Sequence, residues 1–138
     1  LSSSFAFGLG ALDVQRNVRV EGKDKQFAYT SAGSATIASG ATLFLDRGVT
    51  FSYDSLAASR DKLVFTDDSS RLYLNGCTLH STHTGLSLGT GTMVVDDHVI
   101  IESEATELQN EAIAIQTNLN TEILSGAVCD FDGIITYG

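Results

Sequence analysis

The chain has 138 residues, 43% of them hydrophobic, a formal net charge of −9, and no proline or tryptophan. The apolar content excludes a disordered chain and is enough for one folded domain, which we place at residues 1–138. The excess of acidic residues argues against binding to nucleic acid or to an anionic membrane surface, because no basic patch can neutralise phosphates. No apolar run is long enough to insert into a membrane as a spanning helix.

Short apolar alternations mark the first 33 residues. Phe5, Phe7 and Leu9 alternate with small residues and predict either a first strand or a cap. Three more short strands are expected at Leu12–Val14, Val18–Val20 and Phe27–Tyr29. Terminal repeats of stacked proteins are often irregular, so we expect residues 1–33 to form an atypical N-terminal coil or cap.

From Ser34 onward, a unit of three short apolar segments recurs, each too short for a helix and bounded by Gly, Ser or Asp. We expect regular coils over residues 34–131 and the start of a further strand over 132–138. The predicted first strands are Thr36–Ala38, Leu63–Thr66, Leu86–Leu88 and Ala112–Ile115; the second are Thr42–Leu45, Arg71–Leu74, Thr92–Val95 and Thr121–Leu124; the third are Val49–Ser52, Cys77–His80, Val99–Glu102 and Ala127–Phe131.

The corner between the second and third strands is short in every unit. It reads Asp46-Arg47-Gly48, Asn75-Gly76, Asp96-Asp97-His98 and Ser125-Gly126. Glycine adopts left-handed backbone geometry without steric cost, and Asp, Asn and Ser tolerate or cap it. The corner from the third strand back to the first varies, with long segments at Tyr53–Lys62 and Ser103–Glu111. A short helix over Glu104–Ile115 is the alternative to a loop there.

Stacking such units would place side chains in columns about 4.8 Å apart and bury the apolar face of each unit against the next. The predicted inward columns are Leu43/Leu72/Met93, Leu45/Leu74/Val95/Leu124, Val49/Cys77/Val99/Ala127 and Phe51/Leu79/Ile101/Cys129. The predicted fold is therefore all-β, a right-handed parallel β-helix of about four to five coils with three strands each. An antiparallel sandwich is the competing fold, because short strands separated by turn signals also fit it.

The segments ATLFLDRGVTFS, RLYLNGCTLHS and TMVVDDHVIIES resemble coils of right-handed parallel β-helix proteins. The resemblance is closest to the passengers of bacterial autotransporters and to other surface β-helices. It implies a secreted or cell-surface protein, and it carries no catalytic signature over to this chain. The last residues read as an unfinished strand, so we expect a processed product or a segment of a longer protein.

One outward column of the predicted third strands consists of Ser52, His80, Glu102 and Asp130, and all but the serine are ionisable. An imidazole and two carboxylates on one face could perform acid–base chemistry, as the sites of β-helix polysaccharide lyases and hydrolases do by resemblance. The alternative is a solvated strand face. We favour that alternative and expect no catalysis, because the nearest Arg and Lys residues lie on other faces.

Metal binding is considered at two places. Asp46 and Asp96, with Asn75 and Ser125 in the same column, could supply oxygen ligands to Ca²⁺. We favour a ladder of side chains that caps the turn backbone, and hence no cofactor. His80 and His83, with His98 elsewhere, lack a convincing third ligand for zinc. The acidic stretch Glu102–Glu111 is expected to be a solvated surface, with weak cation binding as the alternative.

Cys77 and Cys129 lie two coils apart in the predicted stack, about 9–10 Å, which exceeds the separation of roughly 7 Å that a disulfide allows. We therefore predict two free, buried thiols. A second outward column, Phe44, Tyr73, Val94 and Ile123, forms an apolar stripe. Three interpretations stay open for it: cover by a terminal segment of the chain, lateral contact between protomers, or a platform for a ligand.

The leading functional hypothesis is a structural, self-assembling extracellular or cell-surface solenoid, such as a filament or fibre subunit. Its ends look uncapped, and uncapped sheet edges invite end-to-end pairing. The second hypothesis is an adhesin or carbohydrate-binding module that uses the loops at Tyr53–Lys62 and Ser103–Glu111. The third is a polysaccharide-cleaving enzyme that uses His80, Glu102 and Asp130.

Overall fold

The computed structural model describes residues 1–8, 10–53, 63–81, 86–103, 113–115, 120–132 and 135–137. Within these ranges the chain forms strands and turns but no helix. In that part of the chain, accordingly, no helix is long and apolar enough to cross a membrane. The strands are β1 (Phe5–Phe7), β2 (Leu12–Val14), β3 (Val18–Val20), β4 (Lys25–Tyr29), β5 (Ala35–Ile37), β6 (Thr42–Leu45), β7 (Val49–Tyr53), β8 (Leu63–Phe65), β9 (Arg71–Asn75), β10 (Thr78–Ser81), β11 (Leu86–Leu88), β12 (Thr92–Asp96), β13 (His98–Ser103), β14 (Ile113–Ile115), β15 (Asn120–Ile123), β16 (Val128–Asp132) and β17 (Ile135–Tyr137).

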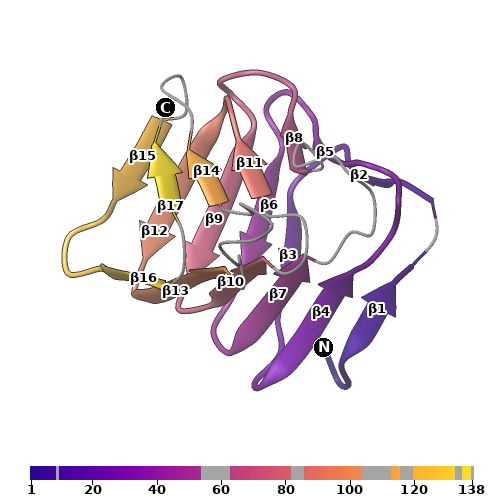
Figure 1. The fold of residues 1–138 in the computed structure, drawn as a ribbon, viewed down its shortest axis with the longest axis horizontal. Coiled ribbons are helices and arrows are strands. Elements are labelled where there is room, and N and C mark those ends of the chain that lie inside the picture. The colour runs from indigo at the N-terminus through magenta and orange to yellow at the C-terminus, as the bar shows by residue number, and fades with distance from the viewer. Residues whose placement is uncertain are drawn as a thin grey trace.

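Every third strand along the chain joins the same sheet. One sheet has six strands in the order β1-β4-β7-β10-β13-β16, and a second has five in the order β15-β12-β9-β6-β3. The third face consists of two three-stranded sheets, β2-β5-β8 and β11-β14-β17, and β8 lies next to β11. Figure 1 shows the strands stacked side by side, with the N-terminus at one end of the stack and the C-terminus at the other.

All paired strands are parallel, which confirms the predicted parallel β-solenoid and excludes the antiparallel sandwich. The inward residues of these strands are mostly β-branched, aromatic or Leu, and the turns carry Gly, Asp and Asn, as a half-buried strand and a tight corner require. The right-handed sense of the coil stays a prediction from the crossover rule.

The predicted inward columns exist across the middle of the stack. Leu43 pairs with Leu72 and Leu72 with Met93, while Leu45 pairs with Leu74 and Leu74 with Val95. All of these side chains are buried in one core cluster. Toward the N-terminus the columns continue through Val18 and Val20 of β3, so the first strands follow the same register as the later ones.

The last coil departs from the predicted register by one residue in its second strand. Ile123, not Leu124, pairs with Val95, because β15 spans Asn120–Ile123. Leu124 instead begins the corner, where its backbone N–H bonds to the carbonyl oxygen of Val95 and its own carbonyl accepts from Ala127. The prediction that Leu124 extends this column was therefore wrong.

The third strand of the last coil is displaced as well. Cys129 pairs with Val99, whereas the prediction paired it with Ile101, and Phe131 takes the place opposite Ile101. The physical reason is the length of the corner: residues 124–127 separate β15 from β16, while a single residue, Asp97, separates β12 from β13. The extra corner residues shift every later side chain along its strand.

The long variable corners fall mostly on residues 54–62 and 104–112, which lie outside the described part of the chain. The helix considered over Glu104–Ile115 lies there too, except that Ile113–Ile115 form strand β14. Leu9, expected to continue the first alternation, also lies outside the described residues.

We expect Leu74→Ala to destabilise the fold by about 2–5 kcal/mol, because Leu74 is completely buried and its loss leaves a cavity. Ile123→Ala is the matched comparison: Ile123 occupies the same column but is 59% exposed, so its loss should cost much less. Urea unfolding followed by circular dichroism would measure both midpoints. Equal shifts for the two variants would contradict the register of this column.

Candidate functional site

The corners between the five-stranded and the six-stranded sheet repeat one backbone conformation. Gly48, Gly76, Asp97 and Gly126 have φ angles of 73°, 58°, 59° and 82°, and Asp24 in the first such corner has 53°. These are left-handed values, which glycine adopts freely and aspartate tolerates. The corners also bond to each other along the stack, since Gly48 N–H donates to the carbonyl oxygen of Gly76 and Gly76 N–H to that of Asp96.

The acidic side chains proposed for Ca²⁺ bond to protein groups at these corners. The Asn75 amide donates to Asp46 Oδ1 over 2.8 Å, and Arg19 pairs with Asp46 Oδ2. Asp96 accepts a 2.8 Å hydrogen bond from the Tyr73 hydroxyl. These contacts join side chains to one another, whereas the predicted ladder was to cap backbone groups of the turns.

Among the described residues, no group of three or more His, Cys, Asp or Glu side chains is arranged to hold a metal ion. His83, one member of the considered histidine pair, lies outside those residues. His80 and His98 each pair with a carboxylate instead, Glu102 and Asp130 respectively.

The outward stripe on the five-stranded sheet has a different composition from the predicted one. Arg19, Phe44, Tyr73, Val94 and Glu122 share this column, because Glu122 rather than Ile123 lies opposite Val94. The Arg19 guanidinium lies 4.8 Å from the centre of the Phe44 ring, and the rings of Phe44 and Tyr73 are 5.2 Å apart. Ile123 belongs to the neighbouring inward column, because it pairs with Val95.

Val94 is buried although it points away from the core. A salt bridge of 3.1 Å joins Arg71 on β9 to Glu122 on β15, two strands away, with β12 between them. Arg71 and Glu122 therefore reach toward each other across β12, and Val94 with Thr92 lies beneath them. A role for Phe44, Tyr73, Val94 and Ile123 as an interface stays a prediction, but Val94 offers almost no surface to a partner.

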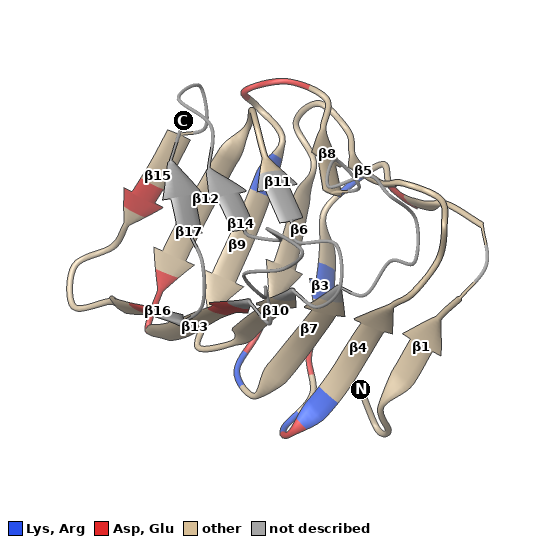
Figure 2. Cartoon of the chain, in the orientation of Figure 1, with Lys and Arg blue, Asp and Glu red and all other residues tan. Residues whose placement is uncertain are grey.

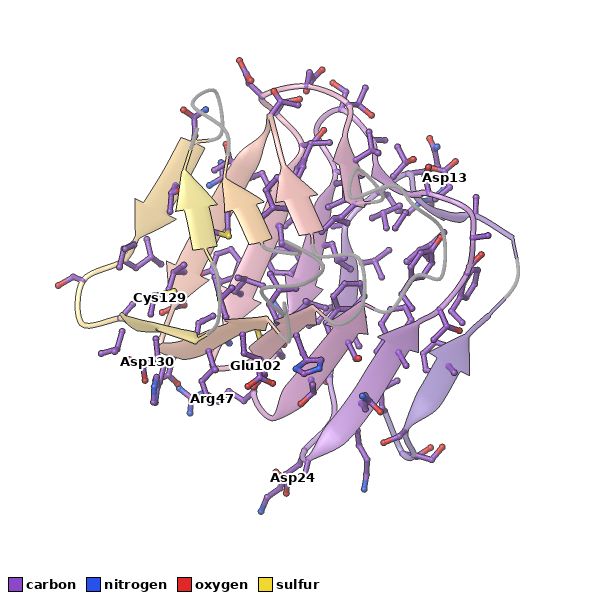
Figure 3. The ribbon with its side chains drawn as sticks, viewed as in Figure 1. Asp13, Asp24, Arg47, Glu102, Cys129 and Asp130 are labelled. Carbon is purple, nitrogen blue, oxygen red and sulfur yellow. The ribbon has the colours of Figure 1, made fainter. Side chains whose placement is uncertain are left out.

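The outward face of the six-stranded sheet aligns three of the four residues predicted for this column. Ser52, His80 and Glu102 lie in one column on β7, β10 and β13, and His80 Nδ1 is 2.6 Å from Glu102 Oε1. Asp130 does not join them, because it pairs with Ile100 while Asp132 lies opposite Glu102. Glu102 and Asp130 lie at separate places along this sheet (Figure 3).

Asp130 instead pairs with His98, and the two side chains are 2.6 Å apart at Nε2 and Oδ2. Both are more than half exposed, so this is a surface pair. The sequence analysis missed this pair and also the outward position of Glu122. The alternation contained the signal for Glu122: with Leu124 inward, the charged Glu122 two residues earlier would also have pointed into the core.

Both cysteines are free, as predicted. Cys77 is buried and Cys129 half-buried. Cys129 pairs with Val99, and Val99 lies on the strand next to that of Cys77. One layer of the stack therefore separates the two thiols. Burial raises the pKa of Cys77 to about 12 and that of Cys129 to about 11.

The N-terminal end of the stack is open and apolar. A hollow of about 770 Å³ is lined by side chains of the first coil, among them Leu1, Phe5, Phe7, Leu12, Val18, Val20 and Phe27. Phe5 and Val18 are each about two-fifths exposed there, although their columns are buried in the coils that follow. At the opposite end, Ile123 and Val128 are more than half exposed.

No protein-family model, curated protein or solved structure matches the chain. The resemblance to surface β-helices therefore supports the fold class only, which the strand pairing establishes independently.

The hydrogen bond to Asp96 raises the pKa of the Tyr73 hydroxyl above its ordinary value, and burial adds to the rise. We expect Tyr73 to ionise at higher pH than a free tyrosine in an ultraviolet titration. Asp96→Asn should reduce this shift, because the largest cause of the raised pKa is lost while the contribution of burial stays. Asp97→Asn is the control: Asp97 pairs with Arg47, so the titration should stay unchanged.

We expect both thiols to react slowly with a disulfide reagent at pH 8 in the folded protein, because the thiolate is the reacting form and both pKa values are raised. Cys129 should react before Cys77, and both should react at once in denaturant. Since the folded pKa of Cys77 exceeds 9.0, its contribution to stability is present below about pH 9 and is lost as the pH rises toward 12. Absence of thiols after denaturation without reductant would reveal a disulfide and contradict the register.

Proposed function

We propose that the protein is a structural β-solenoid that associates end to end with further copies of itself, as the subunit of a filament or fibre. The open N-terminal end supports this most directly. Its inward side chains, Phe5, Val18 and their neighbours, are the same kind that the next coils bury, yet here they line an exposed hollow. Another coil laid on this end would continue the columns and remove these side chains from water.

The two ends offer complementary surfaces. The first coil presents apolar side chains and the outer edge of β1, β2 and β3, while the last presents Ile123 and the outer edge of β15, β16 and β17. Exposed strand edges pair readily with another chain. Because the strands within each sheet are parallel, continued parallel pairing requires the N-terminal end of one copy to meet the C-terminal end of the next.

The distribution of charged residues along the chain favours the same head-to-tail arrangement. All eight Lys and Arg residues of the chain lie between Arg16 and Arg71, and beyond Arg71 every Asp, Glu, Lys or Arg is acidic. Near the N-terminal end, Arg16, Arg19, Lys23 and Lys25 are interspersed with Asp13, Glu21 and Asp24, whereas Asp and Glu side chains lie on β12, β13 and β15 near the other end (Figure 2). Contact between two C-terminal ends would bring like charges together, and head-to-tail contact avoids this.

A contact between two different ends does not close on itself, so repeated addition gives an open filament unless the rotation closes a ring. The adhesin hypothesis depends on loops that lie mostly outside the described residues and stays a prediction. A surface location stays a prediction from the resemblance. The polysaccharide-cleaving hypothesis loses one of its three residues, because Asp130 lies with His98 rather than with His80 and Glu102.

End-to-end association can be tested by sedimentation velocity and negative-stain electron microscopy of the full chain over a range of concentrations. We expect particles that lengthen as concentration rises. Val18→Asp should block the N-terminal end and Ile123→Asp the C-terminal end, since each places a charge on an exposed apolar position. Val64→Asp is the control, because it adds the same charge on the outward side of β8, in the middle of the stack and away from both ends.

A mixture of the two end variants separates head-to-tail contact from contact between like ends. Each variant alone should be monomeric, and the mixture should form a dimer, because the intact C-terminal end of one variant meets the intact N-terminal end of the other. A wild-type chain that stays monomeric at high concentration would overturn the proposal. Dimers of Val18→Asp alone would overturn the head-to-tail arrangement.

A further inference from the structure

We propose that Asn75 is a deamidation site that the folded corner keeps closed and that local opening of the corner makes reactive. Among the asparagines of the chain, only Asn75 is followed by glycine. The backbone nitrogen of Gly76 can approach the Asn75 side chain with little hindrance, because glycine carries no side chain of its own. The two residues lie between β9 and β10, in the middle of the stack, so the site does not depend on the proposed assembly.

The reaction needs no partner other than water. The Gly76 nitrogen bonds to Asn75 Cγ, the Cγ–Nδ2 bond breaks, and Nδ2 leaves as ammonia with the proton that the Gly76 nitrogen gives up. The product is a five-membered succinimide ring, which water opens at either of its two carbonyl carbons. One opening yields aspartate. The other yields isoaspartate, in which the main chain runs through the side chain and gains one methylene group.

In the folded corner, hydrogen bonds hold both reacting groups in place. The Gly76 N–H donates to the carbonyl oxygen of Asp96 over 3.0 Å, and the Gly76 carbonyl accepts from the Gly48 N–H over 3.1 Å. The Asn75 amide donates to Asp46 Oδ1 over 2.8 Å. Attack requires the nitrogen to lose its proton and the amide carbon to turn toward it. Hydrogen bonds to the coils on both sides must therefore break before the reaction can begin.

Two separate demands of the stack place this reactive pair in the corner. Gly76 has a φ of 58°, and a Cβ added there would lie 3.1 Å from Arg47 Cγ, so glycine is the residue that fits. Asn75 bonds to Asp46 of the preceding coil and pairs with Asp96 of the following one. Its amide donates a hydrogen bond to the first carboxylate and separates the two acids without adding charge.

Deamidation would damage the corner through either product. Aspartate at position 75 would remove the donor to Asp46 and leave carboxylates in three successive layers about 4.8 Å apart, where like charges repel. Isoaspartate would lengthen the main chain between β9 and β10. A longer corner shifts the strand that follows it, as residues 124–127 do before β16. A corner that has opened and reacted would therefore not close again in its original form.

The test compares the full chain when folded and when denatured in guanidinium at the same neutral pH and temperature, with mass spectrometry of the peptide that contains Asn75. We expect Asn75 to deamidate at least about 10²-fold more slowly in the folded protein, because only the open corner reacts. Asp46→Ala should raise the folded rate by about threefold or more, since the amide loses its acceptor, and leave the denatured rate unchanged. Asp68→Ala is the matched control: Asp68 lies in another corner of the same coil and bonds to Thr90, so neither rate should change.

The effect of the aspartate product needs a separate measurement. Asn75→Asp should lower the midpoint of urea unfolding, because it places a third carboxylate in the acidic column. Asn17→Asp is its control, since Asn17 accepts from the Thr42 N–H and a carboxylate accepts equally well. Equal deamidation rates in the folded and the denatured chain would overturn the proposal. A folded rate that Asp46→Ala does not raise would overturn the role of Asp46 in closing the site.

Discussion

The register between parallel strands is the constraint on which the rest of this structure depends. Once β6 pairs with β9 and β9 with β12, each residue has a fixed neighbour about 4.8 Å above and below it. Leu45, Leu74 and Val95 then share one column and bury one another. The same ladder places polar side chains in outward columns. Core, corner and candidate sites are therefore all consequences of one set of backbone hydrogen bonds.

The corners keep this register constant from coil to coil. A left-handed residue at Gly48, Gly76, Asp97 and Gly126 turns the chain from one sheet to the next within a few residues. Backbone hydrogen bonds between successive corners, and the bond from Asn75 to Asp46, extend the ladder around the bend. Only the corner before β16 is longer than predicted, and the residues of β16 therefore pair with different residues of β13 from those predicted. The length of a corner thus decides which side chains become neighbours.

The ends and the flank of the stack both depend on this register. The ends expose apolar side chains of columns that the middle buries, and the C-terminal end is acidic, which together favour head-to-tail assembly along the axis. The flank carries rows of side chains whose neighbours depend on which residues the ladder aligns. Ser52, His80 and Glu102 share one column only because three successive coils keep their register. A shift of one residue in β10 would turn His80 toward the core and remove the row.

The sequence by itself determined the fold class, the three strands of each coil and the columns of the middle coils, because Leu, Val and Phe recur at positions that match the two-residue period of a strand. It also determined the free thiols and the left-handed corners. The last coil was decided only by the tertiary structure. Ile123 and Leu124 are equally apolar, so composition could not select between them, and the backbone pairing of β15 with β12 made the choice. With Ile123 inward, Glu122 points outward and pairs with Arg71. The long corner after β15 places Asp130 beside His98. Contacts between coils therefore depend on how many residues each corner contains.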